Sequence, residues 1–302
     1  MNCLICHKSS AKEYHPKCLK ELFGVEWIPA INFTIADLPA KVSQTAGRMS
    51  ISGVQIKASV QLDEQARQLK IAPQGGTYIL KPEPAEYPEL PQNENLCMNL
   101  AAELKLNVPP HGLLKMADGK LCYVIKRFDR VADEKIHKED LAQITGLPTD
   151  AKYSSSLEAV GKAIRDNTKN PYFELYEFFQ RVVFNYVIGN GDMHLKNWSL
   201  LRPDSGTSLA PCYDFVCSKI YLPQEEDSAL AINGKRNKLT RADFEKLAQT
   251  IGLESKPAAN AMDSVRNLTS SRLASFLSAE RQKLFDDIMR ARIGVIESGK
   301  AV

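Results

Sequence analysis

The sequence predicts an α+β protein with two lobes, a β-rich N-terminal lobe and a mainly helical C-terminal lobe. Residues 55–81 alternate apolar and polar side chains, which favours strands. Residues 171–188 carry an apolar stripe at helical spacing, and residues 239–296 add at least two more helices. A chain of 302 residues suggests about two domains. We predict a Cys/His-containing knob at 1–22, which is part of the N-terminal lobe, the rest of that lobe at 23–130, and the helical lobe at 131–302.

The composition is that of an ordinary globular protein, with 44% hydrophobic and 25% charged residues. The net charge of +3 is too small to indicate nucleic-acid binding. No apolar run approaches the roughly 20 residues that span a bilayer, and the N-terminus has no signal-peptide pattern. Seven cysteines leave one over from any intrachain pairing, which favours a reducing compartment. We therefore predict a cytoplasmic protein without a membrane partner.

In the N-terminal lobe, "KASVQL" and "GGTYILK" read as strands, the second of them after a Gly-Gly turn. The four prolines of residues 81–95 predict a loop. Residues 94–106 repeat leucine at helical spacing, so we expect a helix there. "LCYVIKRFDR" is an apolar run that turns charged, as at the end of a strand.

In the C-terminal lobe, the helix at 171–188 has Pro171 at its first turn and Gly189 as its stop. The next segment, "GNGDMHLKNWSLLRPDSGTSLAPCYDFV", contains two short apolar runs around the turn signal "PDSG". These runs predict a β-hairpin. Thr240 is the expected N-cap of a later helix.

Three polar residues surround that hairpin. Asp192 and Asn197 precede it at a spacing of five, and Asp214 follows its second strand. This is the order of catalytic parts in protein kinases. Phosphoryl transfer needs a carboxylate to accept a proton, which suits Asp192, and hard oxygen ligands for Mg²⁺, which suit Asn197 and Asp214. Lys81, at the end of a predicted strand, would contact phosphates, and Glu94 would orient it.

Each of these residues also has an ordinary structural explanation, since Asp and Asn are common in turns. The pattern departs from that of protein kinases as well. Asn-Gly-Asp stands in place of His-Arg-Asp, Asp214 is followed by Phe215 and Val216 rather than Phe-Gly, and no G-x-G-x-x-G occurs in the N-terminal half. The hypothesis therefore depends on the combination and its order along the chain.

Several blocks of the sequence resemble the HipA-like toxin kinases of bacteria. They are "ISGVQIK", "YILKPE", "NENLCMNLAAELKLNVP", "VIKRFDR", "EDLAQITGLPTDAKY" and "GNGDMHLKNWSLL…LAPCYDF", in order between residues 48 and 215. The resemblance implies a bilobed protein-kinase-like fold, ATP and Mg²⁺, and Ser/Thr kinase activity in the bacterial cytoplasm. It implies autophosphorylation of Ser50, and Ser52 is a second candidate because it adjoins Gly53. Lys126 replaces an acidic residue of the family, so only its backbone contacts carry over.

The resemblance also implies roles for individual positions. Asp192 and Lys81 are the implied catalytic residues, Asn197 and Asp214 the Mg²⁺ ligands, and Glu94 the residue that orients the lysine. The implied ATP-binding set is Ser52, Gly53, Val54, Gln55, Ile56, Lys57, Lys81, Lys126, Phe128, His194, Lys196 and Asp214.

The chain reaches "SISGVQIK" by residue 50, which leaves no room for the extra N-terminal subdomain of full-length HipA-like kinases. In this it resembles the short HipT toxins of three-gene systems. That resemblance implies a small HipS-like antitoxin and a HipB-like helix-turn-helix protein as partners, with DNA contacted only through the latter. A protein substrate follows too, such as an aminoacyl-tRNA synthetase or another translation component.

Cys3, Cys6, His15 and Cys18 form a C-x₂-C-x₈-H-x₂-C pattern. Four ligand-type residues at this spacing suit a structural, tetrahedral Zn²⁺ ion. Reduced cysteines that pack as small hydrophobic side chains explain the pattern equally well. Both interpretations stay open at this point.

Two other functions compete with a toxin kinase. A small-molecule phosphotransferase would use the same Asp/Asn/Asp arrangement, and a catalytically idle module would only bind partners. The presence of Lys81, Asp192, Asn197 and Asp214 together argues against the idle module.

Overall fold

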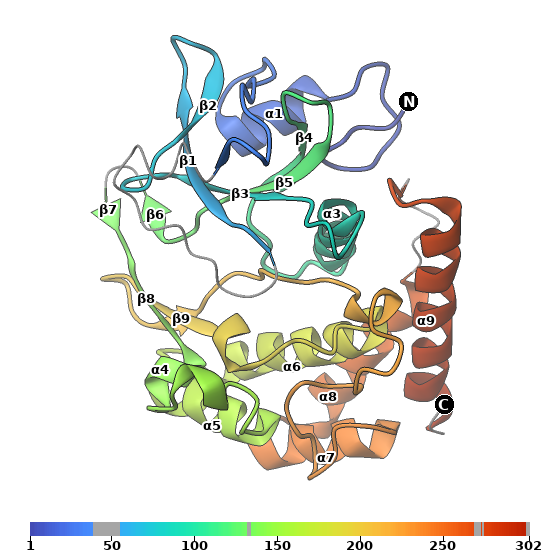
Figure 1. Cartoon of the computed structure of the whole chain (residues 1–302). Helices are drawn as coiled ribbons and strands as arrows, with labels where there is room; N and C mark the ends of the chain where they lie inside the picture. The colour runs from blue at the N-terminus through green and yellow to red at the C-terminus, as the bar shows by residue number, and fades with distance from the viewer. Residues whose placement is uncertain (39–54, 132–133, 269–272, 274, 300–302) are drawn as a thin grey trace. The chain divides into compact units, whose positions relative to one another are not determined.

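The computed structural model describes residues 1–38, 55–131, 134–268, 273 and 275–299 (Figure 1). The chain divides into two compact units, which are described separately below. Unit 1 comprises residues 1–99, 109–134 and 270–277, and unit 2 comprises residues 100–108, 135–269 and 278–302. The α+β class predicted from the sequence is confirmed, with the larger sheet in unit 1 and most helices in unit 2.

Unit 1 is built on a five-stranded antiparallel sheet with the order β2-β1-β3-β5-β4 (Figure 1). Its central strand, β3, has a buried side chain at four of its five positions, as expected for a strand whose two faces are both covered. The strands are β1 (Ala58–Asp63), β2 (Gln68–Ile71), β3 (Tyr78–Pro82), β4 (His111–Lys115) and β5 (Leu121–Lys126), and a separate two-stranded ribbon joins β6 (Arg130–Val131) and β7 (Glu134–Lys135).

Two helices accompany this sheet, α1 (Pro16–Phe23) and α3 (Leu90–Glu103), the second of which crosses the boundary between the units. The predicted loop at 81–95 is wrong at its C-terminal end, because α3 already begins at Leu90. Pro91 did not prevent this, since proline is tolerated in the first turn of a helix, where its missing N–H has no helical partner. Glu94 therefore lies inside α3 rather than at its opening.

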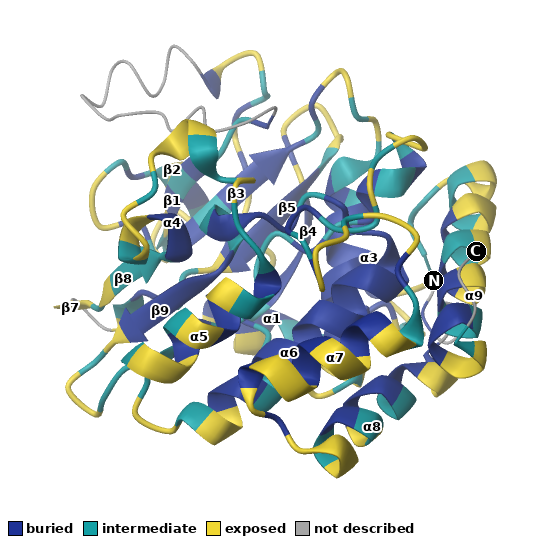
Figure 2. Ribbon diagram, turned by 90° about the horizontal axis from the view of Figure 1, so that it is seen from below, coloured by how far each residue is buried: buried dark blue, intermediate teal, exposed yellow. Residues whose placement is uncertain are grey.

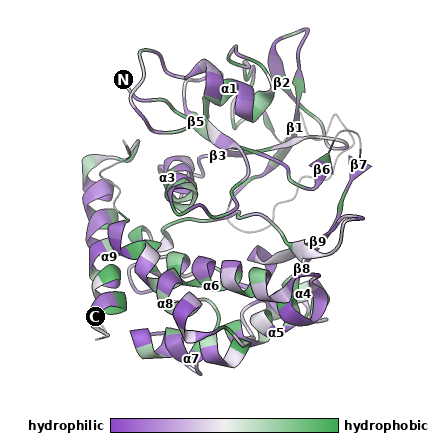
Figure 3. Cartoon of the chain, turned by 180° about the vertical axis from the view of Figure 1, so that it is seen from behind, coloured by the Kyte–Doolittle hydropathy of each residue, from purple (hydrophilic) through white to green (hydrophobic). Residues whose placement is uncertain are grey.

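Unit 2 consists mainly of helices around α6 (Pro171–Ile188), which is buried at every position from Arg181 onward. The other helices are α4 (Leu141–Ile144), α5 (Leu157–Asn167), α7 (Arg241–Ile251), α8 (Ser255–Ser264) and α9 (Ala279–Ser298). The outer helices α5 and α7 show exposed faces in Figure 2, and α7 and α9 mix hydrophilic and hydrophobic residues in Figure 3. They are amphipathic helices that cover the apolar α6.

The ends of α6 follow the sequence prediction. Pro171 occupies its first turn, and Gly189 ends it in the left-handed region at φ 76°. Near this end of α6, Arg292 of α9 donates to the Tyr186 carbonyl at 2.6 Å and pairs with Asp227 at 2.7 Å. The C-terminal end of α6, from which the candidate site begins, is therefore fixed by both packing and charge.

A small three-stranded sheet completes unit 2, in the order β10-β9-β8. The hairpin of β9 (Ser199–Arg202) and β10 (Ser208–Leu209) is the one that the sequence predicts, and β8 (His137–Asp140) adds to its other edge. Thr240 is the N-cap of α7 as predicted, and it forms a capping box with Asp243 in the first turn of that helix. None of the described helices combines the length and the apolar character needed to cross a membrane.

Candidate active site

Unit 1 buries one ion pair completely. Lys81 lies near the end of β3, opposite Tyr123 of β5, and Glu94 lies on α3. Lys81 Nζ lies 2.5 Å from Glu94 Oε1, and the two side chains are only 5% and 1% exposed. A buried charge requires a partner, so each residue fixes the other in place. The structure thus brings together the lysine and the glutamate that the sequence pairs.

The structure describes only part of the segment 50–57, which contains the implied ATP-binding residues 52–57. Ser50, Ser52, Gly53 and Val54 lie outside the described residues. Gln55 is buried, and its Nε2 donates to the carbonyl of Pro82 at 2.9 Å. Ile56 and Lys57 follow, half-buried, and lead into β1. The end of this segment therefore lies beside the residue that follows Lys81.

Lys126 and Phe128, two residues of the implied ATP-binding set, lie at and just after the end of β5. The side chain of Lys126 is exposed and that of Phe128 is half-buried. The Lys126 N–H donates to the Pro110 carbonyl at 2.8 Å, so the sheet edge already uses this backbone donor. Beside them, Asp129 is buried and accepts hydrogen bonds from Arg127 and Arg130 at 2.7 and 2.6 Å. Asp129 thus joins the two arginines of the motif "RFDR" in a local ion network.

In unit 2, Asp192 sits in the turn that follows α6. Asn190 shapes this turn, since its Oδ1 accepts from the Asp192 N–H at 3.2 Å and its Nδ2 donates to Asn185 at 2.8 Å. Asn197 closes the turn from the other side, donating from Nδ2 to the Asp192 carbonyl at 3.0 Å. The Asp192 carboxylate stays 48% exposed. The backbone of this residue is therefore fixed while its side chain faces solvent.

Steric contact explains why glycine occupies position 191 in "NGD". A Cβ on Gly191 would lie 2.5 Å from the carboxylate of Glu225. The Gly191 N–H donates to Ser218 Oγ at 2.9 Å, and Ser218 in turn donates to Glu225. Burial raises the pKa of Glu225, and the nearby charge of Asp192 adds to this. Neither Ser218 nor Glu225 belongs to a motif, so the sequence alone did not indicate them.

Tyr153 and Lys152 are the other site residues that sequence reasoning missed. Tyr153 donates its hydroxyl to Asp192 Oδ1 at 2.6 Å, and its ring meets His194 edge-on at 5.2 Å. Lys152 Nζ donates to His194 Nε2 at 2.9 Å. Both residues belong to the block "EDLAQITGLPTDAKY", which carried the family resemblance but no assigned role. That block was the available signal.

His194 is nearly fully buried, at 7% exposure, between these groups. Burial lowers its pKa, and the Lys152 charge lowers it further, whereas Asp192 and Asp214 raise it. Because Lys152 donates to Nε2, the proton of the neutral ring is on Nδ1. This Nδ1 is buried and has no hydrogen-bond partner among the described residues. It is therefore a donor suited to an acceptor group such as a phosphate or an adenine nitrogen.

Asp214 enters the same region from the segment after β10. It adopts the left-handed backbone region, at φ 56°, which Asp tolerates better than most residues. Next to it, the Tyr213 hydroxyl donates to the Lys196 carbonyl at 3.1 Å and lies 2.5 Å from Ser199 Oγ. These contacts tie the Asp214 segment to the Asp192–Asn197 turn. Unit 2 thus gathers around His194 the two carboxylates and the amide that the sequence predicts.

These residues fit a magnesium–nucleotide complex chemically. Asn197 donates from Nδ2 to the Asp192 carbonyl, so the amide oxygen of Asn197 is the atom that can bind a cation. Together with a carboxylate from Asp214 it offers the hard oxygen ligands that Mg²⁺ prefers. The buried Nδ1 of His194 adds a hydrogen-bond donor for the nucleotide.

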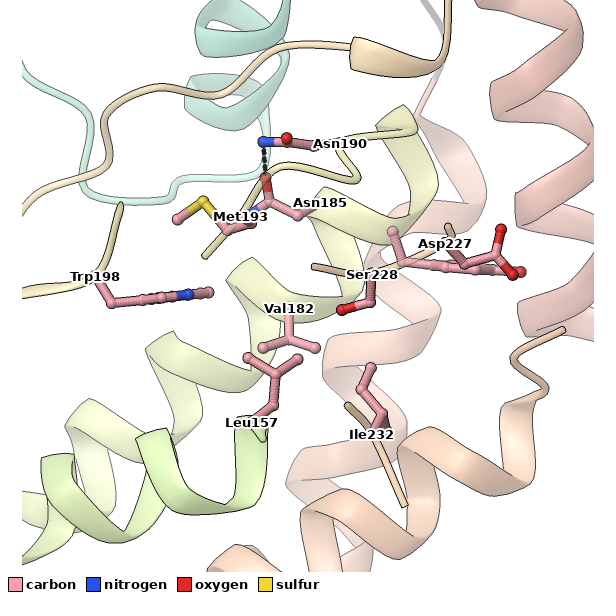
Figure 4. Close-up of a pocket in the computed structure, with 10 residues that line it drawn as sticks. Leu157, Val182, Asn185, Asn190, Met193, Trp198, Asp227, Ser228 and Ile232 are labelled. Atoms are coloured by element: carbon pink, nitrogen blue, oxygen red, sulfur yellow. Dashed lines mark hydrogen bonds between the residues drawn. The ribbon is translucent and has the colours of Figure 1, made fainter. Parts of the chain in front are cut away.

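The small pocket in Figure 4 lies among the residues that pack beneath the site, and it is too small to bind a nucleotide. It lies under the Asn190 turn, beside the Asn185–Asn190 hydrogen bond, and is lined by Met193, Trp198 and apolar residues of α5 and α6. Its volume is about 10 Å³, which is room for about one water molecule. Trp198 Nε1 is buried here with no protein partner in the described structure.

The four residues of the Cys/His pattern also come together. Their ligand atoms lie within 4.8 Å of one another in unit 1. The remaining cysteines, Cys97, Cys122, Cys212 and Cys217, are buried.

Comparisons with known proteins agree with the fold. Residues 49–272 match the HipA-like C-terminal domain. A putative kinase of Sinorhizobium fredii, Y4dM, is 32% identical over 253 residues, which cover 78% of this chain and 61% of that protein. The serine/threonine-protein kinase toxin HipA of Shewanella oneidensis is 27% identical over 65% of this chain and 49% of its own length. The chain therefore spans about half to three fifths of these relatives.

Among solved structures, the chain is similar to HipA of Shewanella oneidensis in its complex with HipB and operator DNA. The TM-score is 0.71 at 19% sequence identity, over 89% of this chain and 71% of that one. At this identity the likeness concerns the fold, which is the α+β fold of a kinase-like protein.

Proposed function

The chain belongs to the family of HipA-like C-terminal domains, and on that basis we propose that it is an ATP- and Mg²⁺-dependent Ser/Thr protein kinase. One observation carries the proposal. Asp192, Asn197 and Asp214, which the sequence places in kinase order, meet around a buried histidine in unit 2. The buried Lys81–Glu94 pair of unit 1 supports it.

Each residue has a role in this proposal. Bound ATP and Mg²⁺ would supply the phosphoryl group and a cation that offsets its charge. Asp192 would accept the proton of the acceptor hydroxyl. Tyr153 engages Oδ1 of Asp192, so it orients the carboxylate and leaves Oδ2 for that hydroxyl. Asn197 and Asp214 would hold Mg²⁺, and Lys81, kept in place by Glu94, would bind phosphate.

The remaining nucleotide contacts follow from the family resemblance. His194 would donate to the nucleotide from Nδ1, with Lys196, Lys126 and Phe128 nearby. The segment from Ser50 to Lys57 would cover the phosphates, and phosphorylation of Ser50 or Ser52 within it would inhibit the enzyme. A phosphoserine carries about −1.5 to −2 charges at pH 7 and would compete for the cations that hold ATP.

We further propose that the chain is a toxin of the short HipT type. Its partners would be a HipS-like small protein and a HipB-like helix-turn-helix protein, with DNA contacted through the latter. The support is that the HipA of the similar structure is bound to HipB and operator DNA. The target would be an aminoacyl-tRNA synthetase or another translation component in the cytoplasm.

Intact-mass measurement after incubation with Mg²⁺-ATP tests the kinase proposal. Wild type should gain one or two phosphates, Asp192→Asn none, and Asp204→Asn, a matched change at an exposed turn residue, the same number as wild type. Turnover of small alcohols without protein labelling would instead favour a small-molecule phosphotransferase. If neither reaction occurs while HipS-like and HipB-like partners still bind, the chain is an idle binding module.

Phosphoproteomics of cells expressing wild type or Asp192→Asn would identify the target. A site phosphorylated only with wild type, and reproduced with purified proteins, defines the substrate. Purified chain that binds operator DNA by itself would contradict the proposal that DNA is contacted only through a partner.

A further inference from the structure

We propose that Cys3, Cys6, His15 and Cys18 bind one structural Zn²⁺ ion. The four residues come from two separate segments, the turn at 3–6 and the start of α1. Their ligand atoms nevertheless lie within 4.8 Å of one another. Three thiols and one imidazole are a ligand set typical of structural zinc.

The distances between ligand atoms match those around a tetrahedral ion. With Zn–S near 2.3 Å and Zn–N near 2.0–2.1 Å, neighbouring ligand atoms lie about 3.5–3.8 Å apart. His15 Nδ1 lies 3.4 Å from Cys6 Sγ and 3.7 Å from Cys18 Sγ. These two distances are close to those of a tetrahedral coordination shell, and all four ligand atoms lie within 4.8 Å of one another.

The second nitrogen of His15 selects the correct tautomer. Nε2 lies 3.0 Å from the Ser9 carbonyl, to which it donates. This contact leaves the lone pair of the neutral ring on Nδ1, the nitrogen that faces the sulfurs, as carbonyl partners do for histidines bound to zinc. The His15 backbone N–H donates to Cys3 Sγ at 3.4 Å, which favours a thiolate there. Both contacts are independent of the cysteine spacing.

The neighbouring histidine, His7, is not part of the cluster. His7 follows Cys6 directly, but its Nε2 lies 2.6 Å from Asn95 Nδ2, so this ring contacts α3. The turn is closed by backbone hydrogen bonds, from Cys3 N–H to Lys8 and from His7 N–H to Cys3, each at 2.9 Å. Among the described residues, these four ligand-type side chains converge, and four protein ligands complete a tetrahedral shell, which indicates a structural ion.

The turn between the first two cysteines joins the N-terminal segment to the rest of unit 1. The Leu4 carbonyl accepts from the Leu113 N–H of β4 at 3.0 Å and from Asn95 at 3.1 Å. The Ile5 carbonyl accepts from Asn99 at 2.9 Å. A Cβ on Gly112 would lie 2.6 Å from Ile5 Cγ1, so β4 leaves space for this turn. The ion would hold in shape the piece of chain that covers the edge strand β4.

Elemental analysis of the chain purified without a histidine tag, under reducing conditions, tests the proposal. We expect one zinc per chain in wild type and in Cys97→Ala, which removes a buried cysteine outside the cluster. Cys18→Ser and His15→Ala should each lose most of the zinc. Less than about a tenth of an equivalent in wild type grown with added zinc would overturn the proposal, and so would equal zinc in wild type and Cys18→Ser.

Cobalt gives a readout that needs no variant, in case Cys18→Ser does not fold. Protein reloaded with Co²⁺ should show the visible bands of a tetrahedral ion and the charge-transfer band of thiolate ligands, and Zn²⁺ should displace both. A colourless or octahedral spectrum with all thiols reduced would overturn the proposal. Neither experiment depends on kinase activity, so the zinc proposal and the proposed function can fail separately.

Discussion

The two units hold their functional charges in opposite ways. In unit 1, Lys81 and Glu94 are 5% and 1% exposed and contact each other at 2.5 Å. In unit 2, the Asp192 carboxylate is 48% exposed and is held by one hydrogen bond from Tyr153. The first arrangement is part of a core, and the second is part of a surface.

Because of this difference, substitutions in the two units should affect the stability of the fold and the proposed activity differently. Removing one partner of a buried pair leaves an unpaired charge in the interior, which costs about 3–5 kcal/mol. Removing a half-exposed carboxylate leaves no such defect, because water solvates the change. Substitutions in unit 1 should therefore impair both folding and activity, whereas substitutions at Asp192 should impair activity alone.

Asp192→Asn should produce the largest effect. Loss of the proton acceptor should lower autophosphorylation by about 10²–10⁴-fold, while the urea midpoint stays within error of wild type. Single-turnover labelling with Mg²⁺-ATP and urea denaturation measure the two quantities on the same sample. Asp204→Asn is the control and should change neither. A residual rate within threefold of wild type would remove Asp192 from the catalytic role.

Lys81→Met should lower the free energy of unfolding by about 3–5 kcal/mol, because Glu94 stays buried without the lysine charge that it contacts. Lys70→Met is the matched control, since Lys70 and Asp63 pair at the surface of the same sheet, with Lys70 54% exposed. It should change stability by less than about 1 kcal/mol. Urea titration of both variants measures the contrast.

The double variant Lys81→Met/Glu94→Leu sharpens this test. Replacing both charges by apolar groups should restore most of the lost stability, but not the activity. An active double variant would show that the pair serves only the fold. Equal losses in Lys81→Met and Lys70→Met would show that burial does not distinguish the two pairs.

A pH titration compares a buried histidine of unit 1 with an exposed one of unit 2. Burial lowers the pKa of His111 from 6.5 to about 4. Below pH 6.5, His111 binds a proton in the unfolded chain, whereas in the folded chain it binds one only near pH 4. The free energy of unfolding therefore falls as the pH falls from 6.5 to 4. The loss from this residue should be about 3 kcal/mol.

His111→Gln should flatten the slope of unfolding free energy between pH 6.5 and 4, measured by urea titration at several pH values. His137, whose side chain is 63% exposed, supplies the control, and His137→Gln should keep the wild-type slope. Parallel curves for wild type and His111→Gln would contradict the assignment.

Tyr153→Phe should produce the smallest effect. It removes the hydroxyl that holds Asp192, and a hydrogen bond to a charged group contributes about 1.5–3 kcal/mol. Because the Asp192 side chain is half exposed, we expect the lower end of this range, a fall in kcat of roughly tenfold with little change in KM for ATP. Tyr172→Phe, at an exposed position of α6, should leave both unchanged. A loss as large as that of Asp192→Asn would mean that Tyr153 itself takes part in proton transfer.

The sequence predicted the residues whose local signals are strong. Lys81 ends a recognisable strand, Gly189 stops a long amphipathic helix, and the turn "PDSG" indicates the hairpin before Asp214. Each signal lies within a few neighbouring residues, so periodicity and turn chemistry suffice to read it. The start of α3 was misplaced because four prolines outweighed the weaker helical pattern around Leu90.

The supporting residues could not be predicted in the same way. Tyr153, Ser218 and Glu225 reach the Asp192 turn from segments far away in the sequence, and tertiary packing alone brings them there. The identity of Gly191 is explained only once Glu225 is seen beside it. Local pattern contains no information on such pairs.

The asparagines of α3 give the N-terminal turn an influence beyond its own size. Asn95 and Asn99 bind the backbone of Leu4 and Ile5, and Asn95 directly follows Glu94 along the helix. Under the zinc proposal, the free energy of metal binding would add to the free energy that keeps this part of α3 ordered. The fraction of chains with a formed Lys81–Glu94 pair would then follow the zinc supply, and zinc would tune the activity proposed for this site.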